Sequence, residues 1–278
     1  MLEAFEHWFG PYPFYEDGYK LVEVPYPGME HQSSVTYGNG YRNGFGNRDI
    51  SYSGWGFKFD FIIIHESGHE WFANNITNWD EADMWIHESF TNYSENLFVE
   101  YHWGKKAGSE YIRGSRIGIL NDRPIIGVYG VNYPGSGDMY PKGANMLHTL
   151  RQVVDDDEKW RGILRGLNEE FYHQTVKAEQ IESYLMEHTG LELEGFFNQY
   201  LRDTRIPTFE YAMIDGELQF RWANCVDNFK LPLKVYINGE PHWLNPSSRW
   251  KFFDSDEKVK KVEIDKDFYV AGFQVVDL

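Results

Sequence analysis

The stretch that decides the fold reads Phe-Asp-Phe-Ile-Ile-Ile-His-Glu-Ser-Gly-His-Glu-Trp-Phe and occupies residues 59–72. Its apolar run predicts a buried helix that delivers the pentad His-Glu-x-x-His. Positions i and i+4 of a helix lie one turn apart on the same face, so His65 and His69 direct both imidazoles toward one point. Glu66 lies on the adjoining flank, where it can act as a general base on a water that a metal holds. The pentad therefore predicts half of a zinc site.

A third ligand is expected from the next apolar-periodic segment, where Glu88 follows Trp85-Ile86-His87. Two imidazoles and one carboxylate leave the fourth position of a tetrahedral zinc open for water, as in catalytic sites. The alternative is that the pentad is accidental in a chain with 10 His and many Glu, in which case these side chains form a surface stripe. The apolar run 62–64 argues against a solvated helix.

The composition indicates a globular chain of 278 residues with 42% hydrophobic and 18% aromatic residues, enough for one large or two ordinary domains. Its 43 acidic against 26 basic residues give a net charge of −17, which disfavours nucleic acid and anionic membrane surfaces and favours neutral or cationic small partners. A merely solubilising acidic surface is the alternative. Cys225 is the only cysteine, so an intrachain disulfide is excluded and the compartment stays undetermined.

The targeting signals are expected to be absent: the first residues do not read as a signal peptide, and no apolar run approaches the ~20 residues of a membrane span. The expectation is a soluble chain with no membrane segment. Its localisation and oligomeric state are not indicated by the sequence.

The pattern along the chain divides it into three regions. Residues 1–57 are rich in Pro, Gly and aromatics and read as extended segments and turns, with two Asn-Gly pairs in the loop 37–46 that we place at the rim of a cleft. From residue 58 to about 206 the period changes to that of helices. The candidate helices are 58–76, 82–103, 105–120, 141–154, 158–173, 177–188 and 193–203. Residues 207–278 alternate as short strands, which predicts a small antiparallel β-sandwich.

Four ordered motifs resemble the aminopeptidase N family of zinc metallopeptidases, the gluzincins related to leukotriene hydrolase. The first is the pentad with its spacing to Glu88. The segment 27–31, Pro-Gly-Met-Glu-His, resembles the family's exopeptidase motif Gly-Ala-Met-Glu-Asn. The segment 88–95 is similar to Glu-Gly-Phe-Ala-x-Tyr-x-Glu, and the segment 140–143 is similar to Tyr-x-Lys-Gly.

The departures from the family's pattern are Pro27, Gly28 and His31 in the exopeptidase motif, and Ser89 in place of a glycine. The family usually carries an N-terminal β domain ahead of the catalytic one, and this chain begins where that domain would end. The resemblance implies an α+β fold. A mainly helical, thermolysin-like zinc metallopeptidase catalytic domain would span 1–206, extended over 1–57 and helical over 58–206, and the small β-sandwich would span 207–278.

The roles that the resemblance implies begin with the metal. His65, His69 and Glu88 would bind one Zn2+ per chain, and Glu66 would take the proton from the attacking water and pass it to the leaving amine. Tyr140 would donate its hydroxyl to the substrate's oxyanion.

Other residues are implied around this centre. Glu30, with Met29 beside it, would pair with the substrate's free α-ammonium. Glu95 would hold a ligand imidazole from behind. His87 is expected to be a packed helix residue rather than a fourth ligand.

The function that follows is zinc-dependent release of N-terminal residues from peptides with a free N-terminus. Two alternatives remain at this stage. One is an endopeptidase or oligopeptidase of the same clan, and the other is an inactive, metal-bound interaction module.

Overall fold

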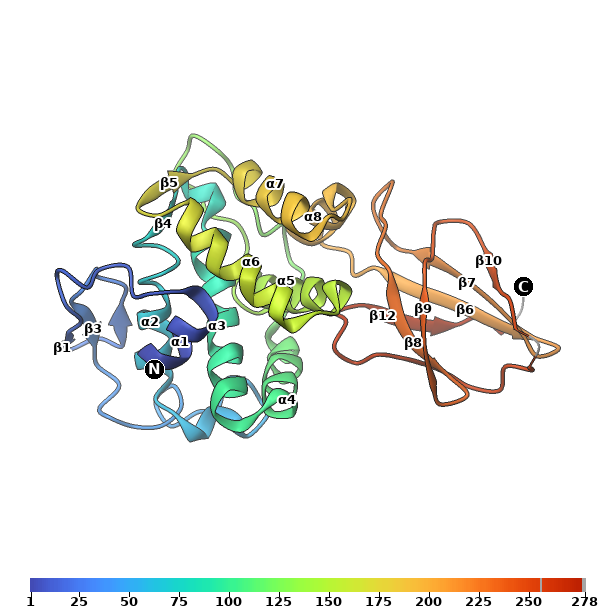
Figure 1. Ribbon diagram of the computed structural model, residues 1–278, viewed down its shortest axis with the longest axis horizontal. Helices are drawn as coiled ribbons and strands as arrows, with labels where there is room; N and C mark the ends of the chain where they lie inside the picture. Colours follow the sequence, from blue (N-terminus) through green and yellow to red (C-terminus); the bar gives the residue numbers. More distant parts are fainter. Residues whose placement is uncertain (256, 277–278) are drawn as a thin grey trace.

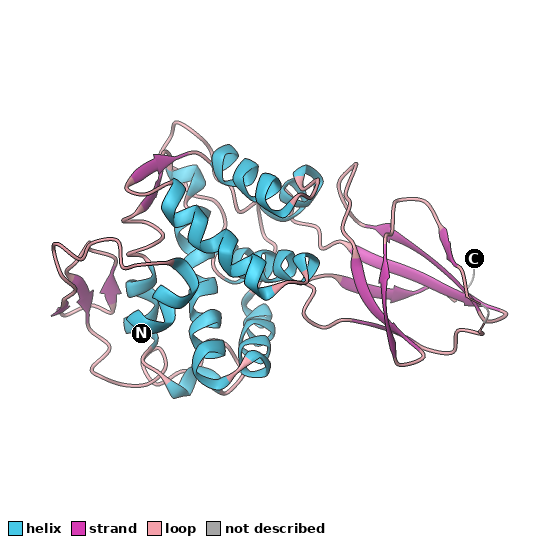
Figure 2. Ribbon diagram, in the orientation of Figure 1, coloured by secondary structure: helices cyan, strands magenta, loops and turns pink. Residues whose placement is uncertain are grey.

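The computed structural model describes residues 1–255 and 257–276. It shows a helical body flanked by a small sheet at one end and by a β-rich body at the other (Figure 1, Figure 2). The helices are α1 Leu2–Phe9, α2 Phe61–Gly68, α3 Trp85–Trp103, α4 Lys105–Ser115, α5 Pro141–Val154, α6 Asp157–Glu170, α7 Ala178–Thr189 and α8 Glu194–Leu201. The strands are β1 Leu21–Glu23, β2 Gly28–Met29, β3 Val35–Tyr37, β4 Ile76–Asn78, β5 Gln174–Val176, β6 Thr208–Ile214, β7 Glu217–Ala223, β8 Leu233–Ile237, β9 Glu240–Leu244, β10 Lys251–Phe253, β11 Val262–Ile264 and β12 Ala271–Gln274.

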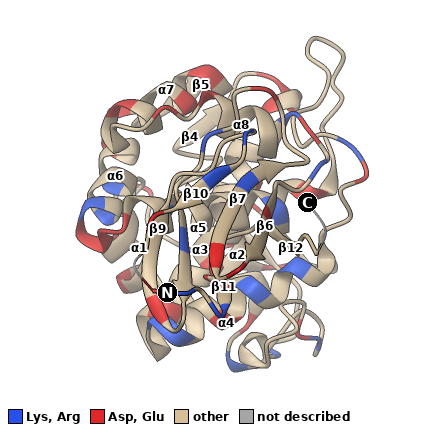
Figure 3. Cartoon of the chain, turned by 90° about the vertical axis from the view of Figure 1, so that its right-hand side faces the viewer, with Lys and Arg blue, Asp and Glu red and all other residues tan. Residues whose placement is uncertain are grey.

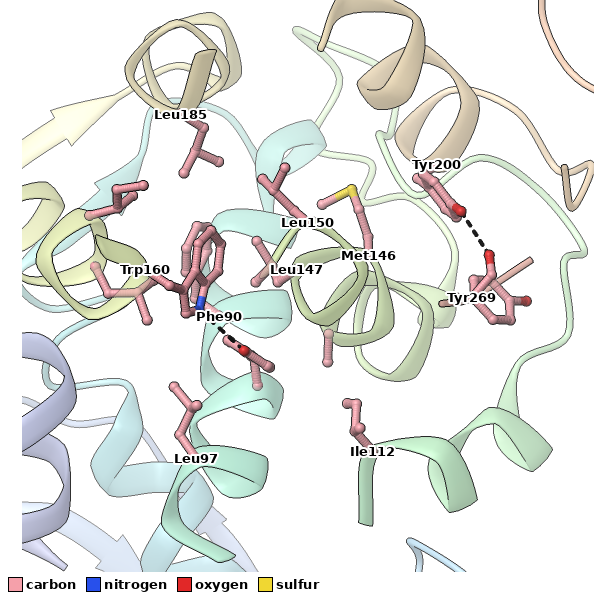
Figure 4. Packing of buried hydrophobic residues seen from close by; sticks show 14 of the residues in the cluster. Phe90, Leu97, Ile112, Met146, Leu147, Leu150, Trp160, Leu185, Tyr200 and Tyr269 are labelled. Carbon is pink, nitrogen blue, oxygen red and sulfur yellow. Dashed lines mark hydrogen bonds between the residues drawn. The ribbon is translucent and has the colours of Figure 1, made fainter. Parts of the chain in front are cut away.

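Helix α3 is the centre of the helical body and contacts α1, α2, α4 and α5. A helix that buries most of its circumference belongs in a core, and α3 is buried along nearly its whole length. The buried hydrophobic cluster includes Phe90 and Leu97 of α3, Leu147 and Leu150 of α5, and Trp160 of α6 (Figure 4). This packing fixes the helix that carries Glu88.

The crossing of α3 and α5 is close because a serine meets a glycine there. A Cβ built on Gly143 would lie 1.9 Å from Ser89 Oγ, so only a glycine lets the two helices approach this far. Ser89 Oγ in turn donates a hydrogen bond of 2.8 Å to the carbonyl of Met139. The contact joins the residue after Glu88 to the segment that carries Tyr140.

The small sheet has the strand order β1-β3-β2, with β1 parallel and β2 antiparallel to β3. β2 is an edge strand, and it lies against α2. A Cβ on Gly28 would come within 2.6 Å of Ile62 Cγ2 and 2.9 Å of Glu66 Cγ. This close approach brings the segment with Met29 and Glu30 to the pentad.

Two sequence predictions in the first half of the chain were wrong. The region 1–57 was expected to be extended, but residues 2–9 form α1, whose Phe5 and Phe9 pack against Trp71. The helix expected over 58–76 is the short α2, which ends at Gly68. After it, the amides of Asn74 and Asn75 bond to carbonyls five residues back, and the chain then enters β4. Both helices have only eight residues, and helices this short depend on tertiary packing for their stability.

The candidate helices from 82 to 203 are confirmed as α3 to α8: α5 has the expected bounds, and the bounds of the others differ from those expected by up to five residues. The short strands β4 and β5, which pair in parallel, interrupt this helical region. They tie the loop after α2 to the loop before α7.

The C-terminal strands form a four-stranded sheet, β10-β7-β6-β12, and a three-stranded sheet, β11-β8-β9. Alternate residues of β7 and β8 are buried, as expected for sheets with one covered face. The expectation of an entirely antiparallel arrangement was wrong for β12, which runs parallel to β6. After β11 the chain crosses to the other sheet, and it re-enters beside β6 in the same direction.

The β-rich body is fastened to the helices through residues 266–269. Tyr200 Oη donates to the carbonyl of Tyr269 at 2.7 Å, and the amide of Tyr269 donates to Thr149 Oγ1 at 2.9 Å (Figure 4). The guanidinium of Arg116 donates to the carbonyls of Lys266 and Asp267. These bonds hold the β-rich body against α5 and α8.

Arg151 is a buried charge of the helical body, only 1% exposed. Its guanidinium donates two 2.7 Å bonds to Glu100 and a 2.9 Å bond to Asp157. Burial alone would raise the pKa of Asp157, but hydrogen bonds from Arg151 and Lys105 outweigh it and lower that pKa to about 2.

The acidic surplus shows on the surface as Asp and Glu along α6 and α7, with Lys and Arg interspersed (Figure 3). Among the helices of the described residues, none combines the length and apolar character needed to cross a bilayer.

Candidate metal centre

The candidate metal centre lies where the last turn of α2 meets the first turn of α3. His65 Nε2 and His69 Nε2 are 3.3 Å apart, and Glu88 Oε2 lies 3.5 Å and 3.4 Å from them. Ligand atoms about 2.0–2.1 Å from a tetrahedral zinc are separated by about 3.3–3.4 Å, so the triangle has the size that such an ion requires. All three side chains are buried.

The tautomer of each imidazole follows from the hydrogen bond that its Nδ1 makes. His65 Nδ1 is 2.8 Å from Glu95 Oε1, and His69 Nδ1 is 3.0 Å from the carbonyl of Phe72. A carboxylate and a carbonyl only accept hydrogen bonds, so each Nδ1 carries the proton and each Nε2 presents a lone pair to the centre. Two lone pairs facing each other repel unless a cation lies between them.

The third atom of the triangle, Glu88 Oε2, also indicates that a cation binds here. Glu88 Oε2 is buried and has no hydrogen-bond partner within the part of the chain that the structure describes. The hydrogen bond that the Tyr140 hydroxyl donates to the other oxygen, Oε1, favours the ionised form of this carboxylate. A buried, ionised and unpaired oxygen is costly unless a cation neutralises it. The donor set therefore fits a divalent metal that accepts nitrogen and oxygen ligands.

Glu66 points to the same region without joining the triangle. It is 7% exposed, and burial raises its pKa above the ordinary value. Carboxylate and imidazole atoms of Glu30, Glu66 and His69 lie within 4.8 Å of one another, so β2 brings Glu30 to the centre. Met29 is 46% exposed, and its side chain is not among those that line the cavity described below.

Tyr140 comes from the residue before α5. Its hydroxyl donates a 2.9 Å hydrogen bond to Glu88 Oε1, the ligand oxygen that faces away from the triangle. Burial, with Glu88 as the nearest charge, raises the pKa of Tyr140, so the phenol stays protonated and remains a donor. Tyr140 thus contacts Glu88 of the triangle and also lines the cavity described below.

Glu95 is held rigidly behind His65. Tyr111 of α4 donates a 2.6 Å hydrogen bond to Glu95 Oε2, and Asn92 Nδ2 donates a 2.9 Å bond to Oε1. Tyr111 was not singled out from the sequence, because only the packing of α4 on α3 brings it there.

His87 and Lys142 are structural in this arrangement. His87 Nε2 accepts a 3.0 Å hydrogen bond from the amide of Asn78, and burial lowers its pKa to about 3. Lys142 is fully buried and donates to the carbonyl of Asp203 at 2.9 Å, which ties α5 to the end of α8.

A cavity of about 560 Å³ opens beside the centre. Its walls include His65, Glu66 and Tyr140, and the segment 45–52 closes one side. The residues that line it from this segment are Phe45, Arg48, Ile50, Ser51 and Tyr52, of which Phe45 belongs to the loop 37–46 that the sequence predicts at the rim of a cleft. The volume is that of ordinary small-molecule sites.

Comparison with known proteins also finds similarity to zinc metallopeptidases. Residues 1–120 match the family model described as the Peptidase family M1 domain. The chain is 26% identical to the aminopeptidase N of Lactococcus lactis subsp. lactis, over 66% of this chain and 24% of that protein. It is 22% identical to a leucyl aminopeptidase of Saccharolobus solfataricus, over 98% of this chain and 37% of that protein. The chain therefore spans well under half the length of these relatives.

Among solved structures, an M1 zinc metallopeptidase from Deinococcus radiodurans bound to a Tyr-Ser-Ala substrate superposes with a TM-score of 0.57 at 23% identity, covering 72% of this chain and 42% of that one. The fold is thus that of a zinc metallopeptidase of mixed α/β type. The match of residues 1–120 to the M1 domain, together with the aminopeptidase relatives, supports the resemblance to the aminopeptidase N family found in the sequence. The metal that this family implies is zinc.

Proposed function

We propose that the chain is a zinc-dependent aminopeptidase, with residues 1–206 as a thermolysin-like catalytic domain and residues 207–278 as a small β-sandwich. The observation that carries the proposal is the buried triangle of His65 Nε2, His69 Nε2 and Glu88 Oε2, with Glu66 beside it. Zinc held there supplies a Lewis acid that polarises the scissile carbonyl and activates water for attack.

The side chains around the triangle perform the remaining steps. Glu66, whose pKa is raised by burial, accepts a proton from the attacking water and delivers it to the leaving amine. The Tyr140 hydroxyl is a protonated donor close to the ligands, and it stabilises the oxyanion that develops on the substrate.

Glu30 gives the proposal its exopeptidase character. A carboxylate within 4.8 Å of the general base and a ligand can pair with a free α-ammonium, and this places the first peptide bond of the substrate at the centre. The substrates are therefore peptides with a free N-terminus. The M1 zinc metallopeptidase of Deinococcus radiodurans, with its Tyr-Ser-Ala substrate, agrees with such a class.

The test compares amino-acid anilides with their N-acetylated forms after saturation of the protein with zinc. The wild type should cleave only the free amines and should bind about one zinc per chain. Glu66→Gln should keep the zinc and lose turnover by several orders of magnitude, because base and ligands are separate residues. Equal cleavage of free and blocked substrates would favour an endopeptidase, and full activity of Glu66→Gln would remove Glu66 from the reaction.

A further inference from the structure

The cavity beside the metal centre extends to one side of Glu66. Glu30, Glu66 and His69 cluster on the side where the substrate's ammonium binds. The cavity walls instead carry His65 and Glu66, together with Phe61 and Ile62 from the preceding turn of α2. A peptide whose amine is held at Glu30 therefore passes the centre and sends the residues after the scissile bond into this cavity.

Arg48 is the single Lys or Arg among the residues of the described chain that line the cavity. Its position is set by a tight turn. The amide of Phe45 donates to the carbonyl of Arg48 at 2.9 Å, and the amide of Arg48 donates to the carbonyl of Phe45 at 3.1 Å. Between them Gly46 and Asn47 have φ of 57° and 66°, the two left-handed residues of a type I′ turn. The turn holds the start of the Arg48 side chain at a defined place on the cavity wall.

The guanidinium is also oriented by a row of rings that ends at a zinc ligand. It lies 5.6 Å from the centroid of the Phe45 ring, within the range of a cation–π contact. The Phe45 ring meets the edge of Phe61 at 5.7 Å, and Phe61 stacks on His65 at 5.3 Å. The rings of Phe45 and Phe61 thus form a continuous row of contacts from Arg48 to His65.

The charge of Arg48 is not neutralised by the chain itself. Within the described residues its guanidinium has no carboxylate at ion-pair distance, although the chain carries 43 acidic residues against 26 basic ones. Its partner on the aromatic row is an uncharged ring, which leaves all five N–H donors of the fork for another group. A planar fork of this kind matches a carboxylate.

We propose that Arg48 binds a carboxylate of the substrate on the leaving-group side of the scissile bond. This inference rests on the proposed aminopeptidase function and adds a substrate class to it. Two sources present the same chemistry in this cavity. One is the C-terminal carboxylate of a di- or tripeptide, and the other is an Asp or Glu side chain directly after the scissile bond.

The experiment uses two matched pairs of peptides with a common N-terminal residue. The first pair is a tripeptide of neutral residues with a free C-terminus and its C-terminal amide. The second pair is a longer amidated peptide with Asp or Asn as its second residue. The wild type should prefer the carboxylate in at least one pair by about tenfold in kcat/KM, the size of one charge-assisted hydrogen bond.

Arg48→Gln should abolish this preference by lowering kcat/KM on the carboxylate-bearing peptide alone, mainly through KM. The pair in which the preference disappears identifies the source of the carboxylate. Arg48→Lys should keep part of the preference, since the charge remains without the fork. Arg42→Gln is the matched control, because Arg42 is exposed on the same loop and does not line the cavity. It should behave as the wild type.

The outcomes separate this inference from the proposed function. Anilides lack the carboxylate, so Arg48→Gln should cleave them at the wild-type rate. If the wild type cleaves anilides and shows no preference in either pair, the Arg48 inference is wrong and the peptidase stands. If no substrate is cleaved, peptide binding by calorimetry still tests Arg48, and equal affinity of the wild type and Arg48→Gln for the free acids would overturn the inference.

Discussion

Glu95 is the residue whose removal tests most directly how the protein prepares the metal centre. Its Oε1 accepts the Nδ1 proton of His65 at 2.8 Å, and its Oε2 accepts the Tyr111 hydroxyl at 2.6 Å. Both bonds are buried, and together they keep the Nε2 lone pair of His65 directed at the triangle. Carboxylates that orient a metal-binding imidazole contribute about 10–100-fold to metal affinity, or about 1.4–2.8 kcal/mol.

The two substitutions at this position should differ in size. Glu95→Gln keeps an acceptor oxygen for His65 and should weaken zinc binding by about tenfold. Glu95→Ala leaves three donors, on His65, Tyr111 and Asn92, without this partner and should approach the upper limit of about 100-fold. The assay is competition for zinc against a chelator of known affinity, with circular dichroism to verify that each variant is folded.

Glu187→Gln is the control for loss of a carboxylate, since Glu187 is exposed on α7. It should bind zinc as the wild type does. If folded Glu95→Ala also matched the wild type, His65 would not depend on Glu95 for its orientation, and the argument from the Nδ1 bond would be refuted.

Four further predictions follow from the structure. Gly143→Ala should destabilise the protein by about 1–3 kcal/mol in urea unfolding, because its Cβ would lie 1.9 Å from Ser89 Oγ, and adding Ser89→Gly should recover most of the loss; no recovery would contradict the close crossing. Tyr140→Phe should lower kcat by about 10²–10³-fold on zinc-saturated protein, because the substrate's oxyanion loses a donor. Unchanged kcat with weaker zinc binding would instead mean that Tyr140 positions Glu88, to which it donates a 2.9 Å hydrogen bond. Glu30→Ala should lower kcat/KM on free-amine substrates by about 30-fold at unchanged zinc content, because removing one partner of a charged pair costs about 2–5 kcal/mol. An equal loss on N-acetylated substrates would exclude the contact between Glu30 and the ammonium group. Asp157, whose pKa is lowered from 3.8 to about 2, stabilises the fold at pH values above 4, and this contribution is lost as the pH falls through about 2. Its side chain is 42% exposed, so Asp157→Asn should lower the free energy of unfolding by only about 1 kcal/mol at pH 7. A penalty that failed to shrink near pH 2 would contradict the lowered pKa.

The sequence predicted the parts of the site that helical spacing connects. His65 and His69 are one turn apart on α2, so the pentad alone brings their imidazoles together. The helices α3 to α8 were also predicted, because their apolar residues repeat with a clear helical period and their ends carry turn signals. The loop 37–46 was predicted at the rim of a cleft, and one of its residues, Phe45, lines the cavity.

The short segments were predicted poorly. Helix α1 has eight residues and strand β2 has two, and such short elements acquire their structure from the surface on which they pack. The parallel pairing of β12 with β6 joins residues far apart in the chain, and no local pattern specifies such a register.

What the sequence determined by itself is the chemistry of the centre: two imidazoles and a neighbouring carboxylate on one helix, with a second carboxylate at the start of the next. What only the tertiary structure decided is the distance from Glu88 Oε2 to both imidazoles, the support of His65 by Glu95 and Tyr111, and the exposure of Arg48 in the cavity. The physical reason is that backbone geometry fixes separations within one helix, whereas separations between elements depend on how closely they pack, as Ser89 and Gly143 do where α3 crosses α5.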